Sequence, residues 1–266
     1  MVMKVAAIIP TYNRRYCIGR AIDSVLQQSS PVDDIIVVDD GSTDGSTEFI
    51  EKTYPDIQLI QQPNQGVSAA RNTGIRHTNC EWIALLDSDD EWLPNKIDAI
   101  RESYSRQPEF NLYHSDEIWI RNGVRVNAMN KHRKSGGWIF PNCLPLCVIS
   151  PSAAVISRQL LLDEGLFNEL LPACEDYDMW LKICHQYPVA FIKEQLIIKH
   201  GGHDDQLSRA HVAMDRFRIQ AIDDLLDSRQ LNPDYKALSI QTLNSKLKIL
   251  LGGAQKHGNH ELVDQL

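Results

Sequence analysis

The sequence predicts an α/β domain in which helices flank a mixed sheet, followed by a C-terminal helical extension. Strand-like and helix-like segments alternate four times near the N-terminus with short links between them, which is typical of a parallel sheet. The strand-like runs are largely apolar, as expected where helices cover both faces of a sheet. Two of these runs end in adjacent aspartates, at the sheet edge where open α/β folds bind ligands.

The expected elements follow from apolar runs, helical stripes and turn residues. Strands are expected at 5–9, 35–38, 57–60 and 83–86, and helices at 16–28, 47–53, 67–77 and 96–107. Further on, short strands are expected at 111–113, 153–156, 189–192 and 196–198, with helices at 158–163 and from residue 175. Residues 119–147 show no clear period, and so long a stretch is usually a functional loop. We expect residues 1–210 to form the α/β domain and residues 211–266 the extension.

Length and composition limit the class of protein. The 266 residues are enough for one large core, and 43% hydrophobic and 23% charged residues are typical of globular proteins. No apolar run reaches the ~20 residues that span a bilayer, and no signal-peptide pattern precedes the first strand. The net charge of −8 argues against nucleic acid as a partner. The six cysteines lack metal-ligand spacing and are interpreted as reduced thiols, which predicts a cytoplasmic protein.

The strand expected at 83–86 runs directly into Asp87, Ser88, Asp89 and Asp90. If the backbone stays extended, Asp87 and Asp89 point to the same side. Two carboxylates that close resist being ionised together unless a cation lies between them. Mg²⁺ or Mn²⁺, with phosphate oxygens as further ligands, suits such a pair. The alternative is that Asp89 or Asp90 only caps the helix that follows.

Five motifs in the same order resemble those of the family-2 glycosyltransferases, which have the nucleotide-sugar-binding GT-A fold. They are IIPTYNR, IIVVDDGSTD, QPNQGVSAARNTGI, WIALLDSDDEWLPNKI and PACEDYDMWLKI. With their spacing they cover roughly residues 4 to 205, and five matches in order are far more specific than any one of them. The resemblance implies a Rossmann-like GT-A sheet and transfer of a sugar from a nucleotide-sugar.

The resemblance also implies a nucleotide site. Asp39 matches the aspartate that pairs with the uracil imide in uridine-using members, and an ionised carboxylate is a suitable acceptor for that N–H. Its alternative is a turn cap, and the alternative for Arg71, which matches a nucleotide-side arginine, is a solvated helix face. The residues assigned to nucleotide binding are Pro10, Thr11, Tyr12, Asp39, Arg71, Asp87 and Ser88.

Three further residues receive metal or base roles from the same resemblance. Asp89 is expected to ligand Mn²⁺ or Mg²⁺, with His203 from a glycine-flanked loop as another ligand; an exposed loop histidine is the alternative. Asp176 is expected to be the general base, because an acceptor hydroxyl is a poor nucleophile until its proton is being removed. Its alternative is a favourable place in the first turn of a helix. Direct displacement from the opposite face of the sugar predicts inversion at the anomeric carbon.

The remaining segments leave alternatives open. The basic residues 131–134 either contact a phosphate or form a solvated charge run, and Trp138 either stacks on a sugar or belongs to the core. Residues 206–209 resemble part of the QxxRW motif of processive synthases, but Ala210 replaces the tryptophan and membrane helices are absent, so processive synthesis is not expected. The extension is expected to break at residues 232–233 and 252–253, and is compatible with packing on the domain, a homodimer or another partner.

The sequence therefore predicts a metal-dependent, inverting transfer of one sugar from a nucleotide-sugar, with UDP-sugars favoured, to a hydroxyl acceptor. A glycan or lipid-linked glycan is the expected acceptor, which is compatible with peripheral membrane association. One alternative is a non-catalytic sugar-nucleotide-binding or scaffold protein, which a donor-hydrolysis assay would distinguish. The other is a sugar-phosphate nucleotidyltransferase, which needs a glycine-rich basic loop after the first strand, whereas PTYNRRYCIG has a lone glycine there.

Overall fold

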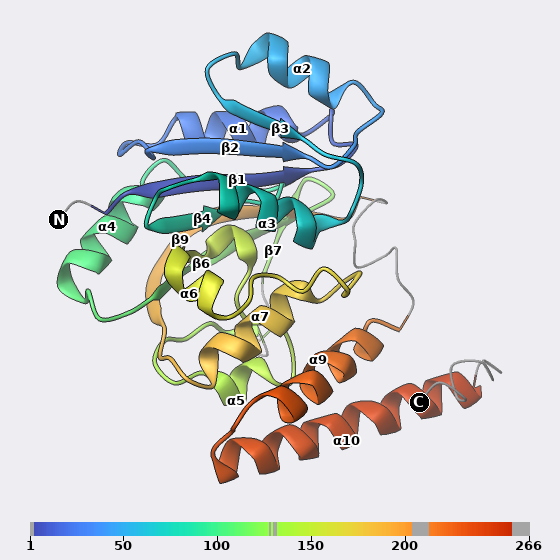
Figure 1. Ribbon diagram of the computed structural model, residues 1–266. Coiled ribbons are helices and arrows are strands. Elements are labelled where there is room, and N and C mark those ends of the chain that lie inside the picture. The colour runs from blue at the N-terminus through green and yellow to red at the C-terminus, as the bar shows by residue number, and fades with distance from the viewer. Residues whose placement is uncertain (1–2, 128, 130–131, 204–212, 257–266) are drawn as a thin grey trace.

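The computed structural model describes residues 3–127, 129, 132–203 and 213–256 (Figure 1). Within these residues nine strands form one sheet in the order β3-β2-β1-β4-β8-β6-β9-β5, with β7 beside β6. The strands are β1 Val5–Thr11, β2 Asp34–Asp39, β3 Gln58–Gln61, β4 Trp82–Leu85, β5 Glu91–Trp92, β6 Leu112–Arg121, β7 Val124–Val126, β8 Val155–Ser157 and β9 Ala190–Gly201. Strands β1 to β4 pair with one another in parallel, whereas β8 is antiparallel to both β4 and β6. The expected mixed α/β sheet is confirmed.

Helices cover both faces of the parallel half because alternate residues of its strands face opposite cores. In β1, Ala6 and Ile8 belong to the core that includes α3 (Val67–His77), whereas Ala7 and Ile9 belong to the core that includes α1 (Ile18–Leu26). α4 (Lys96–Arg106) adds apolar residues to the second core, and α2 (Ser46–Thr53) packs beside β3. This two-sided burial explains the continuous apolar runs in the sequence.

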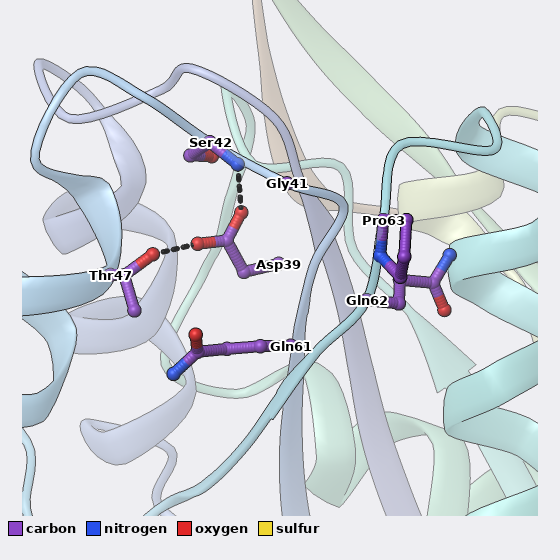
Figure 2. A pocket seen from close by; sticks show the side chains of 7 residues that line it. All are labelled: Asp39, Gly41, Ser42, Thr47, Gln61, Gln62 and Pro63. Atoms are coloured by element: carbon purple, nitrogen blue, oxygen red, sulfur yellow. Dashed lines mark hydrogen bonds between the residues drawn. The ribbon is translucent and has the colours of Figure 1, made fainter.

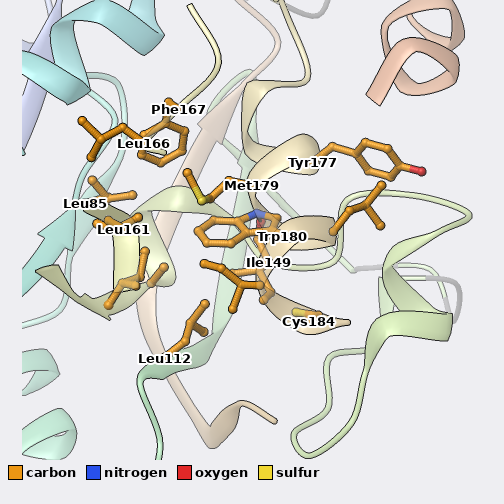
Figure 3. Close-up of a cluster of buried hydrophobic side chains, with 14 of the residues drawn as sticks. Leu85, Leu112, Ile149, Leu161, Leu166, Phe167, Tyr177, Met179, Trp180 and Cys184 are labelled. Carbon is orange, nitrogen blue, oxygen red and sulfur yellow. Dashed lines mark hydrogen bonds between the residues drawn. The ribbon is translucent and has the colours of Figure 1, made fainter. Parts of the chain in front are cut away.

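The second half of the chain builds its core around α7 (Glu175–Cys184), with α5 (Phe140–Cys143) and α6 (Arg158–Asp163) nearby (Figure 3). Trp180 of α7 is fully buried, and its indole Nε1–H donates to the carbonyl oxygen of Ile149 at 2.8 Å. The Tyr177 hydroxyl donates to the carbonyl oxygen of Leu144 at 2.6 Å. α7 thereby fixes the irregular chain that precedes β8.

The helical extension packs on this second half. α9 (Asp215–Ser228) lies against α7, and α10 (Pro233–Lys256) lies along α9 and touches α5 (Figure 1). The Lys246 ammonium of α10 is buried and donates to the carbonyl oxygen of Pro145 and to Asp215, both at 3.0 Å. α10 continues through Gly252, so the expected break there is wrong, whereas Pro233 begins the helix as expected. The division at residue 210 stays a prediction, and residues 206–209 lie outside the described residues.

No helix among the described residues is long and apolar enough to span a bilayer.

The described parts of residues 119–147 contain more regular structure than the sequence predicts. β6 runs ten residues to Arg121, β7 pairs with it, and α5 follows, while β9 is one strand of 12 residues where two short strands are expected. The pairing of β6 with β9 has register shifts around Asp116, which obscure the period of two.

Lys134 is buried in an ion pair with Glu117 at 3.0 Å, so it is not part of a solvated charge run. Trp138 is 59% exposed, so the core alternative for it is wrong.

Helix α3 approaches β1 closely at Gly74. A Cβ added there would lie 2.6 Å from Cγ2 of Ile8, a distance that no relaxed packing allows. Gly74 therefore sets how near α3 lies to the sheet, and the same helix carries Arg71 one turn earlier. The closeness of this contact makes the position of Arg71 depend on Gly74.

We expect Gly74→Ala to lower the free energy of unfolding by about 1–3 kcal/mol, the usual cost of overpacking a core. Gly253→Ala is the matched control, because a Cβ there meets no atom within 4 Å and removes a helix-interior glycine. That control is expected to raise stability by roughly 0.5–1 kcal/mol. Urea unfolding of both variants measures the difference, and equal effects would contradict the close approach.

Candidate active site

A hollow of about 230 Å³ lies at the carboxyl ends of β2 and β3 (Figure 2). Asp39, the last residue of β2, lines it, and its Oδ1 accepts the backbone N–H of Ser42 at 2.9 Å. Its Oδ2 accepts the hydroxyl of Thr47 on α2. Asp39 thus caps the turn and also lines the hollow, and each oxygen keeps a second lone pair for a ligand donor. The residues lining the hollow are Asp39, Gly41, Ser42, Thr47, Gln61, Gln62 and Pro63.

The neighbouring carboxylate, Asp40, braces the loop at the edge of this hollow. It accepts the side-chain amide of Gln62 at 2.7 Å and the backbone N–H groups of Gln65 at 3.0 Å and Gly66 at 2.8 Å. The adjacent aspartates therefore differ in use: Asp39 lines the hollow, whereas Asp40 is occupied by backbone and side-chain donors.

The predicted residues at the end of β1 lie beside this hollow because β1 and β2 are parallel and Thr11 pairs with Asp39. Pro10 is buried, and the buried Thr11 hydroxyl has no hydrogen-bond partner among the described residues. Tyr12 is 47% exposed, so its ring is accessible to a bound molecule.

The chain after β4 turns instead of staying extended. The backbone N–H of Asp90 donates to the carbonyl oxygen of Asp87 at 3.0 Å, which closes a tight turn. The extended backbone on which the same-side expectation depended therefore does not occur. Asp87 contacts Arg71, whereas Asp89 contacts His203. Ser88 between them is 7% exposed.

Asp89 and His203, the two predicted metal ligands, lie together. Asp89 Oδ2 and His203 Nε2 are 2.9 Å apart, each side chain is 21% exposed, and Arg20 of α1 donates to the Asp89 carbonyl oxygen. One carboxylate and one imidazole fit Mn²⁺ if diphosphate oxygens and waters complete its coordination. Among the described residues no group of three acidic, histidine or cysteine side chains is placed to hold a metal ion.

The three acids at the start of α7 differ in exposure. Glu175 and Asp178 are buried, at 4% and 1%, whereas Asp176 is half-buried. Burial raises the pKa of Asp178, and the Lys182 ammonium at 2.6 Å opposes that rise. Asp176 Oδ1 accepts the N–H of Tyr177 at 2.7 Å, and Oδ2 lies 3.2 Å from the Cys147 thiol. Asp176 is therefore the acid of this group that a substrate can reach.

Arg71 joins the two acidic centres. Its guanidinium donates to Asp87 Oδ1 at 2.7 Å and to Glu175 Oε1 at 2.5 Å, and the residue is 2% exposed. Burial by itself lowers the pKa of Arg71, but the two carboxylates outweigh burial and hold the pKa above its ordinary value. Burial raises the pKa of Glu175, and Arg71 opposes that rise. The contacts of Arg71 are thus with carboxylates, and its assignment to the nucleotide stays a prediction.

Lys199 of β9 lies among several carboxylates of the site. Its ammonium donates to Ser150 Oγ at 3.2 Å. Burial lowers the pKa of Lys199, but the attraction of surrounding carboxylates outweighs burial and raises the pKa above its ordinary value; these carboxylates are Asp90, Glu117, Asp87 and Asp176. Asp90 itself accepts the Ser152 hydroxyl at 2.6 Å, and burial, opposed by Lys199, raises its pKa well above the usual range.

Several residues of this centre were not predicted from the sequence, namely Gln61, Cys147, Ser152 and Lys199. Lys199 follows the apolar run 196–198 of β9, but the same strand also contains Lys193 and Glu194, so a lysine there is a weak signal. Cys147 and Ser152 carry no such signal, because their partners lie 29 and 62 residues away.

We expect Arg71→Met to lower the free energy of unfolding by about 3–5 kcal/mol, because two buried carboxylates would lose their cation. Arg76→Met is the matched control on the same helix, since Arg76 is 55% exposed and its ion pair with Glu169 is long, at 3.7 Å. Its expected effect is within about 0.5 kcal/mol. Chemical denaturation tests both, and a similar effect of the two substitutions would refute the buried bridge.

Sequence comparisons identify the family of the chain. The family model described as Glycosyl transferase family 2 matches residues 6–159, more than half of the chain. An uncharacterized glycosyltransferase of Rickettsia bellii is 32% identical over 196 residues, which are 73% of this chain and 28% of that protein. WfgD of Escherichia coli, named as a UDP-Glc:alpha-D-GlcNAc-diphosphoundecaprenol beta-1,3-glucosyltransferase, is 27% identical over 217 residues, 80% of this chain and 81% of WfgD. The chain spans about a third of the length of the curated relatives that match it first.

Solved structures show the same fold. TarS of S. aureus (residues 1–349), in complex with UDP-GlcNAc, has a TM-score of 0.73 at 20% identity, covering 94% of this chain and 73% of that one. The mannosyltransferase PcManGT of Pyrobaculum calidifontis, in complex with GDP-Man and Mn²⁺, has a TM-score of 0.65 at 18% identity, covering 95% and 75%. The sheet is thus of the GT-A type, and the match over residues 6–159 shows that the chain belongs to glycosyl transferase family 2.

Proposed function

We propose that the chain transfers one sugar from a UDP-sugar to a hydroxyl acceptor, in a metal-dependent reaction that inverts the anomeric carbon. The observation that supports this most directly is the Arg71 bridge, which joins the turn after β4 to the start of α7. Around that bridge the acids fall into two groups. Asp40, Asp90, Glu175 and Asp178 are buried and paired, whereas Asp89 and Asp176 stay partly exposed for substrates.

The donor side of the proposal rests on the hollow at Asp39. A pyrimidine ring is small enough for about 230 Å³, and Asp39 presents carboxylate lone pairs to it while Gln61 adds an amide. A uracil imide N–H donates to a carboxylate, whereas a guanine base needs more room and a different set of partners. The names of two similar proteins also include uridine nucleotides, UDP-Glc for WfgD and UDP-GlcNAc for TarS.

Asp89 and His203 are the residues that would hold Mn²⁺ or Mg²⁺. Both side chains are partly exposed and within 2.9 Å of one another, so a small shift opens a place between an oxygen and a nitrogen ligand. When bound, the metal would stabilise the negative charge of the leaving diphosphate. PcManGT, which has the same fold, is described with Mn²⁺.

Asp176 is the proposed general base. The acceptor oxygen forms a bond to the anomeric carbon as the bond from that carbon to the diphosphate oxygen breaks, and the electron pair leaves with UDP. Asp176 takes the acceptor proton as this happens, because the hydroxyl becomes a strong nucleophile only as it loses that proton. Attack from the face opposite the diphosphate gives inversion.

A glycan or lipid-linked glycan is the proposed acceptor class. Its support is limited to WfgD, whose name gives a diphosphoundecaprenol-linked acceptor. Transfer of a single sugar, peripheral membrane association and a homodimer through α9 and α10 remain predictions from the sequence.

The proposed roles of the two acids predict different kinetic losses. Asp89→Ala should weaken UDP binding in Mn²⁺ as well as turnover, because Asp89 contributes in both the ground and transition states. Asp176→Asn should bind UDP as well as the unchanged protein does while turnover falls by ~100-fold or more, the scale of a lost general base. Calorimetric UDP titration and UDP release from UDP-sugars measure the two effects. Asp163→Asn, an exposed carboxylate on α6, is the control and should change neither. Near-normal turnover of Asp176→Asn would remove it from the base role.

The hollow at Asp39 predicts a preference for UDP over GDP. Asp39→Asn should weaken UDP binding by about tenfold or more, the scale of one charge-assisted hydrogen bond, and leave GDP binding nearly unchanged. Glu48→Gln, an exposed residue beside Thr47 on α2, removes a nearby charge without touching the hollow and serves as the control. Competitive titration in Mn²⁺ gives the affinities, and tighter binding of GDP than of UDP would overturn the uracil assignment.

A further inference from the structure

The segment 144–149, between α5 and β8, is held by side chains from distant parts of the chain. It is irregular, yet four of its backbone carbonyl oxygens accept hydrogen bonds from such side chains. The donors and acceptors are Tyr177 to Leu144 at 2.6 Å, Lys246 to Pro145 at 3.0 Å, Lys134 to Val148 at 3.0 Å and Trp180 to Ile149 at 2.8 Å. A segment without regular structure is normally free to move, but here α7, α10 and the residues before α5 fix it in place.

Cys147 is the residue that this segment presents to the proposed base. Its Sγ lies 3.2 Å from Asp176 Oδ2 and 3.2 Å from the carbonyl oxygen of Ile149. A thiol has one hydrogen, so it can serve one of these acceptors at a time. The Ile149 oxygen already accepts the indole N–H of Trp180, and a carboxylate is the stronger acceptor. The geometry therefore favours a bond from the thiol to Asp176.

We infer that Cys147 is a positioning residue whose S–H group donates to Asp176 Oδ2 and orients that carboxylate toward the acceptor hydroxyl. The inference rests on the proposed function of Asp176 as general base. The two carboxylate oxygens of Asp176 then have different partners. Oδ1 is held by the Tyr177 N–H at 2.7 Å, and Oδ2, held from one side by the thiol, keeps a lone pair for the acceptor proton.

A thiol suits this place better than a stronger donor. Burial, followed by the charge of Asp176, raises the pKa of Cys147 well above its ordinary value, so the proton stays on sulfur. A charged donor such as arginine favours the ionised form of a carboxylate and so weakens it as a base. The two adjacent acids differ in their partners, because Glu175 is paired with the Arg71 guanidinium at 2.5 Å while Asp176 meets a neutral thiol.

The test compares Cys147→Ala, which removes the donor, with Cys147→Ser, which keeps one. With UDP-glucose or UDP-N-acetylglucosamine and Mn²⁺, UDP release by Cys147→Ala should fall about tenfold in kcat. Its KM for the donor and its calorimetric affinity for UDP should stay within twofold, roughly, because the nucleotide side is untouched. Cys147→Ser should recover most of the loss. Cys143→Ala is the control, since the Cys143 thiol faces Cys184 and not a carboxylate, and it should turn over normally.

A double-variant cycle separates this inference from the proposed function. If Cys147 acts through Asp176, then Cys147→Ala should change turnover by less than about twofold in the Asp176→Asn background. Near-normal turnover of Asp176→Asn alone would overturn the base assignment. If Asp176→Asn loses turnover as expected but Cys147→Ala has an equal effect in both backgrounds, only the role of Cys147 is overturned.

A spectroscopic measurement tests the contact without any turnover. The S–H stretching band of Cys147, identified by infrared difference against Cys147→Ala, should lie at lower frequency in the unchanged protein than in Asp176→Ala. The same band position in both proteins would show that the thiol does not donate to Asp176. Thermal unfolding of each variant establishes that the comparison is made on folded protein.

Discussion

The arrangement of the site depends on the two hydrogen-bonded ion pairs that Arg71 makes with Asp87 and Glu175. One carboxylate follows β4 in the parallel half, and the other begins α7 in the second half, 104 residues from Arg71. A guanidinium is a planar fork that can serve two carboxylates at once, which the point charge of a lysine does less well. Without this cation the two carboxylates would repel each other, so the bridge fixes the distance between the turn after β4 and the start of α7.

Many of the acids near the bridge are structural, and this distinguishes the site from a simple cluster of charges. Asp40 holds the 62–66 loop and Asp90 joins Ser152 to the backbone of β9. The Lys199 ammonium attracts the surrounding carboxylates, so the site contains an internal cation besides Arg71. Burying charged pairs of this kind costs desolvation energy. Here the buried pairs hold the few partly exposed acids in defined positions. Asp89 and Asp176 are those acids.

The second half of the chain achieves rigidity by means other than regular structure. Segment 144–149 has its carbonyl groups satisfied by side chains of α7, α10 and Lys134. Satisfied backbone groups are what allows a buried irregular segment to be stable. The extension therefore helps to hold this segment, because Lys246 of α10 donates to the carbonyl oxygen of Pro145.

The sequence by itself determined the parallel half and showed that acids follow two of its strands, because both rest on local signals. Apolar runs that stop at Asp39 and Asp87 mark strand ends, and α3 has the predicted bounds. The long β6–β9 pair, the burial of Lys134 and the course of α10 through Gly252 were decided by tertiary structure. A bulged strand loses its period, and a lysine becomes buried only when Glu117 lies opposite it. The different partners of Asp39 and Asp40, and of Glu175 and Asp176, likewise depend on hydrogen-bond donors far away in the chain. No local sequence pattern encodes those contacts.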